Sequence, residues 1–95
     1  MRLISDKPLR EFCESHPEAR EPIWAWRSII LKGAFPNYAA LKQAFNATDK
    51  VGDFCVFDIG GNNYRVVAAI HFNRQRLYIR FILTHAEYDR GDWKK

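Results

Sequence analysis

The sequence predicts an α+β domain in which an N-terminal strand and helices pack on one face of an antiparallel β-sheet. Three runs between residues 53 and 84 are rich in Val, Ile, Phe and Tyr. Two turn sequences separate them, Gly60-Gly61-Asn62-Asn63 and Asn73-Arg74-Gln75-Arg76. Two hairpins in series make an antiparallel meander. The residues before this meander carry apolar positions at helical spacing, so we expect them to form the layer that covers it.

Side-chain alternation predicts which face of the meander is buried, because neighbouring residues of a strand point to opposite faces. We expect Ile59 opposite Tyr64 and Phe72 opposite Leu77. The buried face then holds Cys55, Phe57, Ile59, Tyr64, Val66, Ala68, Ile70, Phe72, Leu77, Ile79, Phe81 and Leu83. The opposite face holds Arg65, Val67, Ala69, His71, Tyr78, Arg80, Ile82 and Thr84. Two arginines are therefore expected to share the uncovered surface.

The first residues predict a short strand and then a helix. Met1–Ser5 is short and apolar at its centre, which fits a strand added to the sheet. Ser5 or Asp6 offers an N-cap for the helix that follows. This helix is expected to end near His16-Pro17, because a residue before proline avoids the helical conformation.

Two further helices are expected before the meander. Ser15 is placed to cap a helix that opens at Pro17-Glu18 and stops at Gly33. Asn37 is placed to cap a third, short helix. The polar segment Asn46–Gly52 is expected to be a loop that leads into the sheet.

A capping box is expected to open the last helix. Thr84 and Glu87 are spaced so that each side chain can bond the backbone N–H of the other residue. The helix that follows puts His85, Tyr88 and Asp89 on one side, three and four residues apart. Since the helix starts beside the arginine-bearing face, His85 and Tyr88 are expected near those arginines.

Composition favours a compact protein with one modest core, so residues 1–95 are expected to form a single domain. Hydrophobic residues make up 47% of the 95 residues and aromatic residues 15%, which argues against disorder. No apolar run approaches the roughly 20 residues that span a bilayer, and we expect a cytoplasmic protein without membrane contact. Cys13 and Cys55 are isolated and the histidines are scattered, so neither a disulfide nor a metal or other cofactor is expected.

The positive charge is concentrated in the second part of the chain. Residues 1–59 hold eight Lys or Arg and eight Asp or Glu, whereas residues 60–95 hold seven basic and three acidic residues. The whole excess of +4 therefore belongs to the sheet and the tail. A basic surface of this kind attracts phosphate backbones, although many small proteins have a similar excess without binding nucleic acid.

Four segments resemble one family in the same order and spacing. They are A-F-P-N-Y-A-A-L-K-Q-A-F from Ala34, F-D-I-G-G-N-N-Y-R-V-V from Phe57, Y-I-R from Tyr78 and T-H-A-E-Y-D from Thr84. Together they resemble the HigB-type toxins of type II toxin–antitoxin systems, within the RelE superfamily. The resemblance implies a RelE-like α+β fold and a ribosome-dependent, metal-independent endoribonuclease that cuts mRNA. It also implies inhibition by a helix-turn-helix antitoxin of the HigA type, with DNA contacted only through that antitoxin.

Metal-free RNA cleavage requires a group that stabilises phosphate charge and groups that move protons. Arg65 and Arg80 are the candidates for holding the scissile phosphate, because a guanidinium stays charged and grips two oxygens. The alternative is that they are surface arginines that pair with acids such as Asp58. His85 and Tyr88 are the candidates for proton transfer. Alternatively, His85 only decorates the start of a helix and Tyr88 fills the core.

Three further residues are candidates for RNA binding. Tyr78 either stacks on a base or packs against a neighbouring side chain. Lys94 and Lys95 either attract the RNA backbone or belong to a disordered end. A second function class also stays open, a non-catalytic module, for example a degenerate toxin, that binds RNA or a protein through the same basic face.

Overall fold

The computed structural model describes residues 1–94 and confirms the α+β class. Five strands form one sheet in the order β1-β5-β4-β3-β2, and β1 is the only strand paired in parallel within the described residues. The strands are β1 (Arg2–Leu3), β2 (Thr48–Val51), β3 (Phe54–Ile59), β4 (Tyr64–His71) and β5 (Arg76–Thr84). The helices are α1 (Lys7–Ser15), α2 (Arg20–Lys32), α3 (Tyr38–Ala44) and α4 (His85–Arg90). Short 3₁₀ turns lie at Pro17–Ala19, Phe72–Arg74 and Asp92–Lys94.

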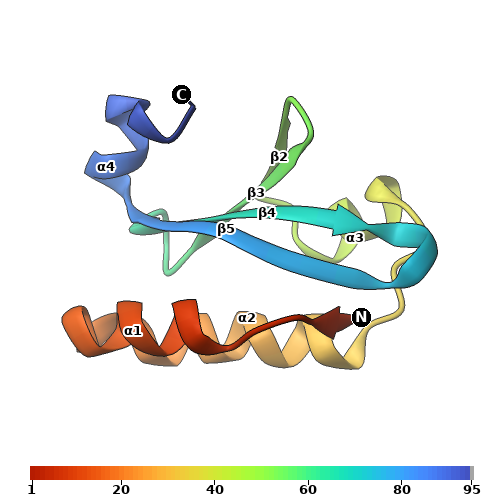
Figure 1. The fold of residues 1–95 in the computed structure, drawn as a ribbon, viewed down its shortest axis with the longest axis horizontal. Coiled ribbons are helices and arrows are strands. Elements are labelled where there is room, and N and C mark those ends of the chain that lie inside the picture. Colours follow the sequence, from red (N-terminus) through yellow and green to blue (C-terminus); the bar gives the residue numbers. More distant parts are fainter. Residues whose placement is uncertain (95) are drawn as a thin grey trace.

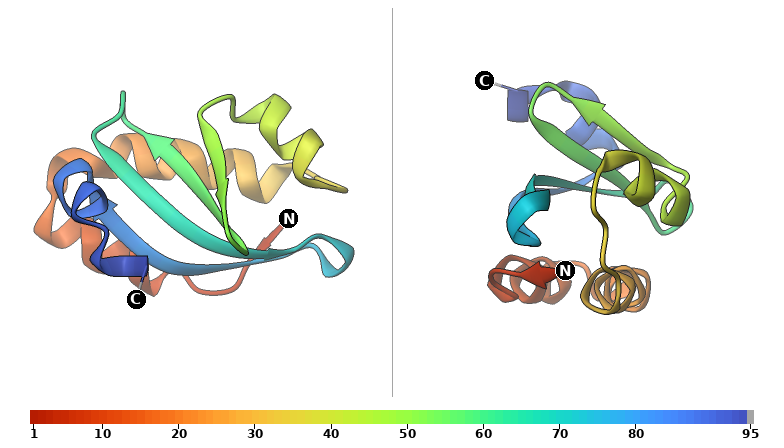
Figure 2. Two further views of the ribbon diagram at one scale, coloured as in Figure 1. Left: turned by 90° about the horizontal axis from the view of Figure 1, so that it is seen from above. Right: turned by 90° about the vertical axis from the view of Figure 1, so that its right-hand side faces the viewer.

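The helices lie on both faces of the sheet. Helices α1 and α2 run side by side beneath it, and α4 stands on the opposite face at one end (Figure 1). The end-on view in Figure 2 shows the first two helices as neighbouring circles below the strands. The face that was predicted to be uncovered is therefore partly covered, by α4 and the C-terminal 3₁₀ turn. Within residues 1–94, no helix combines the length and apolar character needed to cross a bilayer.

The main core fills the space between the first two helices and the sheet. Its fully buried aliphatic and aromatic side chains are Leu9, Ile23, Ile30, Leu41, Phe57, Val66 and Leu77. Asp6 connects the two helices by accepting bonds from Arg27 at 3.0 and 2.9 Å, and this interaction lowers the pKa of the carboxyl group. Because Asp6 is used in this way, it does not cap α1 with its side chain, although it occupies the N-cap position.

Two predictions about helix ends and loops were wrong. Ser15 is the last residue of α1 and caps nothing; a 3₁₀ turn begins at Pro17, and α2 starts only at Arg20. Pro17 has no backbone N–H, so a capping side chain has one hydrogen-bond donor fewer to satisfy at the start of this turn. The segment Asn46–Gly52 contains strand β2, which pairs with β3 along Thr48–Val51. An edge strand with exposed polar residues lacks the alternation that would have predicted it. By contrast, Asn37 caps α3 as expected.

The register of the meander is partly as predicted. Ile59 lies opposite Tyr64, which confirms the first hairpin. In the second hairpin Leu77 pairs with Ile70, not with Phe72, so the register is shifted by two residues. Gln75 explains the shift, because it adopts a left-handed conformation at φ 54° and its side chain bonds the carbonyl oxygens of Phe35 and Phe72. An even shift leaves the assignment of faces unchanged.

A β-bulge then reverses the faces of the last part of β5. Val67 pairs with Phe81 and Ala68 with Ile79, which leaves Arg80 as the extra residue. One extra residue inverts the alternation beyond it. The side chains of Phe81 and Leu83, predicted to be in the core, therefore lie on the α4 face. Ile82 packs against the main core, so its placement on the uncovered face, together with that of Thr84, was also wrong.

Candidate active site

The candidate site lies where β3, β4 and the start of α4 meet. Asp58 on β3 lies opposite Arg65 on β4, as the first hairpin requires. The capping box predicted for α4 is present: Thr84 Oγ1 accepts from the Glu87 N–H at 3.2 Å, and the Glu87 carboxylate accepts from the Thr84 N–H at 2.9 Å. The first N–H of the helix, that of His85, donates to a carbonyl of the β3–β4 turn at 2.9 Å. These bonds hold the start of α4 against the hairpin.

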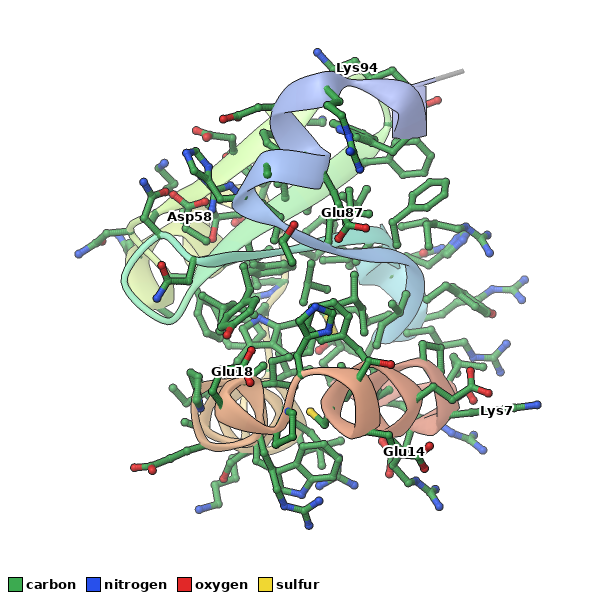
Figure 3. The ribbon with its side chains drawn as sticks, turned by 90° about the vertical axis from the view of Figure 1, so that its left-hand side faces the viewer. Lys7, Glu14, Glu18, Asp58, Glu87 and Lys94 are labelled. Atoms are coloured by element: carbon green, nitrogen blue, oxygen red, sulfur yellow. The ribbon has the colours of Figure 1, made fainter. Side chains whose placement is uncertain are left out.

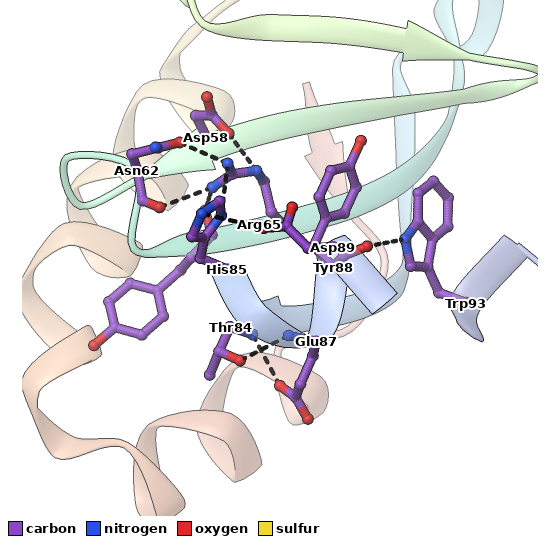
Figure 4. A network of polar contacts seen from close by, with 10 residues as sticks. Asp58, Asn62, Arg65, Thr84, His85, Glu87, Tyr88, Asp89 and Trp93 are labelled. Atoms are coloured by element: carbon purple, nitrogen blue, oxygen red, sulfur yellow. Dashed lines mark hydrogen bonds and ion pairs between the residues drawn. The ribbon is translucent and has the colours of Figure 1, made fainter. Parts of the chain in front are cut away.

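Arg65 is the centre of the polar network in Figure 4. Its Nε lies 2.5 Å from Asp58 Oδ1, in an ion pair. Nη1 donates to the carbonyl oxygens of Asn62 and Tyr64 at 3.1 and 3.2 Å. Nη2 lies 2.6 Å from Asn62 Oδ1 and 3.3 Å from His85 Nδ1. A guanidinium has five N–H donors, and here each has an acceptor. Arg65 is only 7% exposed, which makes this pairing necessary.

The neighbours of His85 define its protonation state in this structure. Arginine can only donate, so Nδ1 of His85 must accept the bond from Arg65. The other nitrogen, Nε2, lies 3.2 Å from Asp89 Oδ2 and is therefore the one that carries the proton. The imidazole is neutral in this arrangement. The side chains of His85 and Asp89 are 50% and 58% exposed, so a substrate can reach them.

Tyr88 joins the network to a second, smaller apolar cluster. The guanidinium carbon of Arg65 lies 5.2 Å from the Tyr88 ring centroid. The Tyr88 ring also stacks on Trp93, with the ring centroids 5.1 Å apart and the ring planes 17° from parallel. The cluster also contains Val56, Val67 and Leu83. Burial raises the pKa of Tyr88 above its ordinary value, although Arg65 opposes this effect. Its hydroxyl is therefore protonated at neutral pH.

The structure does not bring the second predicted arginine to this network. Arg80 is exposed in the bulge, and its guanidinium carbon lies 5.6 Å from the ring of Tyr78. Arg80 lies opposite the step between Val67 and Ala68, two to three residues along β4 from Arg65, or roughly 7 to 10 Å along the strand. Tyr78 also contacts His71 edge to face at 5.4 Å. These residues form a separate surface group.

The remaining candidates lie at the end of the chain. Lys94 is exposed, with Nζ 5.6 Å from the Trp93 ring centroid. Lys95 lies outside the described residues. Within residues 1–94, no three His, Cys, Asp or Glu side chains are close enough to hold a metal ion together.

Three residues of the network were not identified as site residues from the sequence. Asn62 was assigned only to a turn, and its bond to Arg65 depends on its left-handed backbone at φ 79°. The contact of Asp89 with His85 could have been predicted, because Asp89 is four residues after His85 on the same helix face. Trp93 belongs to none of the sequence motifs described above, and it packs in the smaller cluster.

The arrangement combines three chemical capabilities within one contact network. Arg65 supplies fixed positive charge, His85 supplies a neutral imidazole beside a carboxylate, and Tyr88 supplies a protonated phenol. A cation that stabilises phosphate charge, together with one proton acceptor and one donor, is the set that phosphodiester cleavage requires.

Comparison with known proteins gives a consistent result. Residues 19–91 match the family model of HigB toxins, described as the RelE-like toxic component of a toxin–antitoxin system. The mRNA interferase toxin HigB of Escherichia coli strain K12 is 38% identical over 92 residues, which cover 94% of this chain and 88% of that protein. The mRNA interferase HigB of Shigella flexneri has the same identity and coverage. The mRNA interferase HigB of Escherichia coli O6:H1 is 31% identical over 93 residues, or 95% of this chain and 90% of that protein.

Proposed function

The chain belongs to the HigB family of RelE-like toxic components of toxin–antitoxin systems, and on this premise we propose that it is an endoribonuclease that cleaves mRNA. The relatives named above are called mRNA interferases. The observation that carries the proposal is the position of His85, with one ring nitrogen against Arg65 and the other against Asp89. This geometry leaves one basic lone pair beside a fixed positive charge.

In the first step the scissile phosphate binds at Nη2 of Arg65. It replaces the side-chain oxygen of Asn62 and draws Nη2 away from His85. Asn62 is exposed in the β3–β4 turn, so its carboxamide can leave without uncovering the core. The Asp58 ion pair stays in place and keeps the guanidinium oriented. Catalytic hydrogen bonds in an unliganded site commonly rearrange when the substrate binds.

In the second step the ribose 2′-hydroxyl attacks the adjacent phosphorus. Nδ1 of His85, released by Arg65, accepts the proton from that hydroxyl. The ring then carries a positive charge, which the Asp89 carboxylate stabilises through Nε2. The positive charge of Arg65 stabilises the negative charge that builds up on the phosphate oxygens.

In the third step the bond to the 5′-oxygen breaks, and this oxygen takes a proton from the Tyr88 hydroxyl. The raised pKa of Tyr88 keeps that proton available at neutral pH. The products are a 2′,3′-cyclic phosphate and a 5′-hydroxyl. No step in this scheme uses a metal ion.

We also propose the setting in which the reaction occurs. The mRNA is cut on the ribosome, in the cytoplasm, and an antitoxin of the helix-turn-helix HigA type inhibits the toxin. DNA is contacted only through that antitoxin. Further contacts with the RNA come from Arg80, Tyr78, Lys94 and Lys95. Arg80 lies beside the ring of Tyr78 and outside the hydrogen-bond network of Arg65. This proposal differs from the expectation that Arg65 and Arg80 together hold the scissile phosphate.

One observation favours the second function class. All five donors of Arg65 already have acceptors within the protein, which is also what a purely structural arginine would show. In that case the basic face only binds RNA or a protein. Primer extension after induction separates the two classes. Cleavage ends in translated transcripts that disappear when the antitoxin is co-expressed support the nuclease; intact transcripts during growth arrest support the binding module.

A further inference from the structure

A cavity of about 260 Å³ lies on the other side of α4 from the candidate active site. We call it the α4 cavity; its lining residues are Phe81, Leu83, Glu87, Arg90 and Trp93. Figure 3 shows the separation, with Asp58 to the left of α4 and Glu87 to its right. None of these five residues takes part in the proposed reaction.

The β-bulge gives this cavity its aromatic wall. Because Arg80 is the extra residue in β5, the side chains of Phe81 and Leu83 face α4 and not the core. Leu83 is partly covered by the smaller apolar cluster, whereas Phe81 is 38% exposed. An aromatic ring that stays exposed in a cavity offers a flat surface to a planar ligand.

A continuous series of rings connects this cavity to the proposed site of cleavage. Tyr88 lies over Arg65 and stacks on Trp93 at 5.1 Å. The Trp93 ring lies 6.4 Å from that of Phe81. Arg65 and Trp93 occupy the faces of the Tyr88 ring, and Trp93 itself is buried, whereas Phe81 is exposed. Among these rings, Phe81 is therefore the one that can stack on a base of a strand held at Arg65.

The polar groups of the cavity fit a base better than a phosphate. The Glu87 carboxylate is fixed by the Thr84 N–H, and this bond lowers the pKa of Glu87. A permanent negative charge in the wall repels phosphate. Arg90 is exposed beside it and can donate hydrogen bonds to the edge of a base.

We propose that the α4 cavity receives one unpaired nucleobase of the RNA that flanks the scissile nucleotide. The base stacks on Phe81, and Arg90 bonds its edge. The inference rests on the proposed nuclease function and extends it, because it makes these two residues determinants of which sites in a transcript are cut.

The test uses the full chain on translating ribosomes, with cleavage sites mapped by primer extension. Phe81→Leu removes the ring and keeps an apolar side chain, whereas Phe81→Tyr keeps the ring. Arg90→Gln removes the donor charge, and Arg10→Gln on α1 is its charge-matched control. We expect cleavage by Phe81→Leu to fall about tenfold at sites that Phe81→Tyr still cuts normally. Arg90→Gln is expected to change the preferred base next to the cut, and Arg10→Gln is not.

The outcomes separate this inference from the proposed function. If the wild type cuts mRNA and Phe81→Leu and Arg90→Gln cut the same sites at the same rates, the cavity is not a base site and the nuclease proposal stands. If the wild type does not cut mRNA at all, both proposals are wrong. If the variants weaken only antitoxin binding, the occupant of the cavity is a protein segment, and the base assignment is overturned.

Discussion

Nη2 of Arg65 lies 3.3 Å from Nδ1 of His85, and this contact determines which nitrogen of the imidazole carries a proton. Since the guanidinium can only donate, the lone pair of His85 points at a positive charge until that charge finds another partner. A phosphate is such a partner. In the mechanism that we propose, the same contact holds the base inactive without RNA and releases it when RNA binds, which links substrate binding to the first proton transfer.

The Arg65–Asp58 pair is predicted to contribute strongly to stability. Asp58→Ala leaves a guanidinium that is 7% exposed without its ionic partner, and breaking such pairs costs about 3 kcal/mol or more. Urea unfolding should show this loss. Asp49→Ala on strand β2, where the carboxylate is exposed, is the control and should change the free energy of unfolding by less than about 0.5 kcal/mol. Equal stability of the two variants would contradict the structural role of the pair.

Asn62→Gly is predicted to keep or raise nuclease activity. Glycine accepts the left-handed conformation at φ 79°, and the change removes the carboxamide that the phosphate has to displace. Stability should fall by about 1 kcal/mol because one hydrogen bond to Arg65 is lost. Activity is measured as the rate of mRNA cleavage on ribosomes. A loss of tenfold or more would show that Asn62 itself belongs to the substrate site.

Asp89→Asn is predicted to lower the rate of cleavage without changing the affinity for the ribosome–mRNA complex. The carboxamide oxygen can still accept from Nε2 of His85, but it cannot stabilise a positive ring. We expect roughly a tenfold lower kcat with an unchanged KM and an altered pH profile. Asp53→Asn, in the β2–β3 turn, is the matched control. An unchanged kcat would show that Asp89 does not assist His85 in catalysis.

The capping box predicts a pH-dependent contribution of Glu87 to stability. Folding lowers the pKa of Glu87, chiefly because the Thr84 N–H bonds the ionised carboxylate. The stabilisation is therefore complete above the pKa of the unfolded chain, and it is lost as the pH falls through the lower folded pKa. Relative to Glu87→Gln, the wild type should be more stable by about 1 kcal/mol at neutral pH, with the difference vanishing in acid. Free energies of unfolding of both proteins, measured from neutral to acid pH, test this prediction. A stability difference that does not change with pH would contradict it.

Local sequence signals predicted most of the fold. The β3–β4 hairpin follows from a glycine-asparagine turn of even length, and the start of α4 follows from the spacing of Thr84 and Glu87. The bulge at Arg80 left no such signal, since Phe81, Ile82 and Leu83 are apolar on both faces. In a run that is apolar on both faces, the pattern of alternating side chains does not show where an extra residue interrupts it. Strand β2 escaped prediction because pairing with β3, a tertiary interaction, forms it.

The site could be predicted in part for the same reason. Arg65, His85 and Tyr88 come together because a regular hairpin and a helix cap position them. Arg80 was expected on the same face as Arg65; it lies at the bulge beside the ring of Tyr78, and its part in the site stays a prediction. The role of Asn62 depends on a backbone conformation, and that of Trp93 on the path of the chain after α4. Neither of these appears in a residue pattern.

The rate of a single round of mRNA cleavage by His85→Ala on purified translating ribosomes tests the central claim most directly. His85 is half exposed, so its removal should leave the fold intact, as circular dichroism can check. If Nδ1 of His85 takes the proton from the 2′-hydroxyl, the rate should fall by about 10² to 10⁴-fold while binding to the ribosome is kept. A rate within a few fold of the wild type would contradict the proposed mechanism.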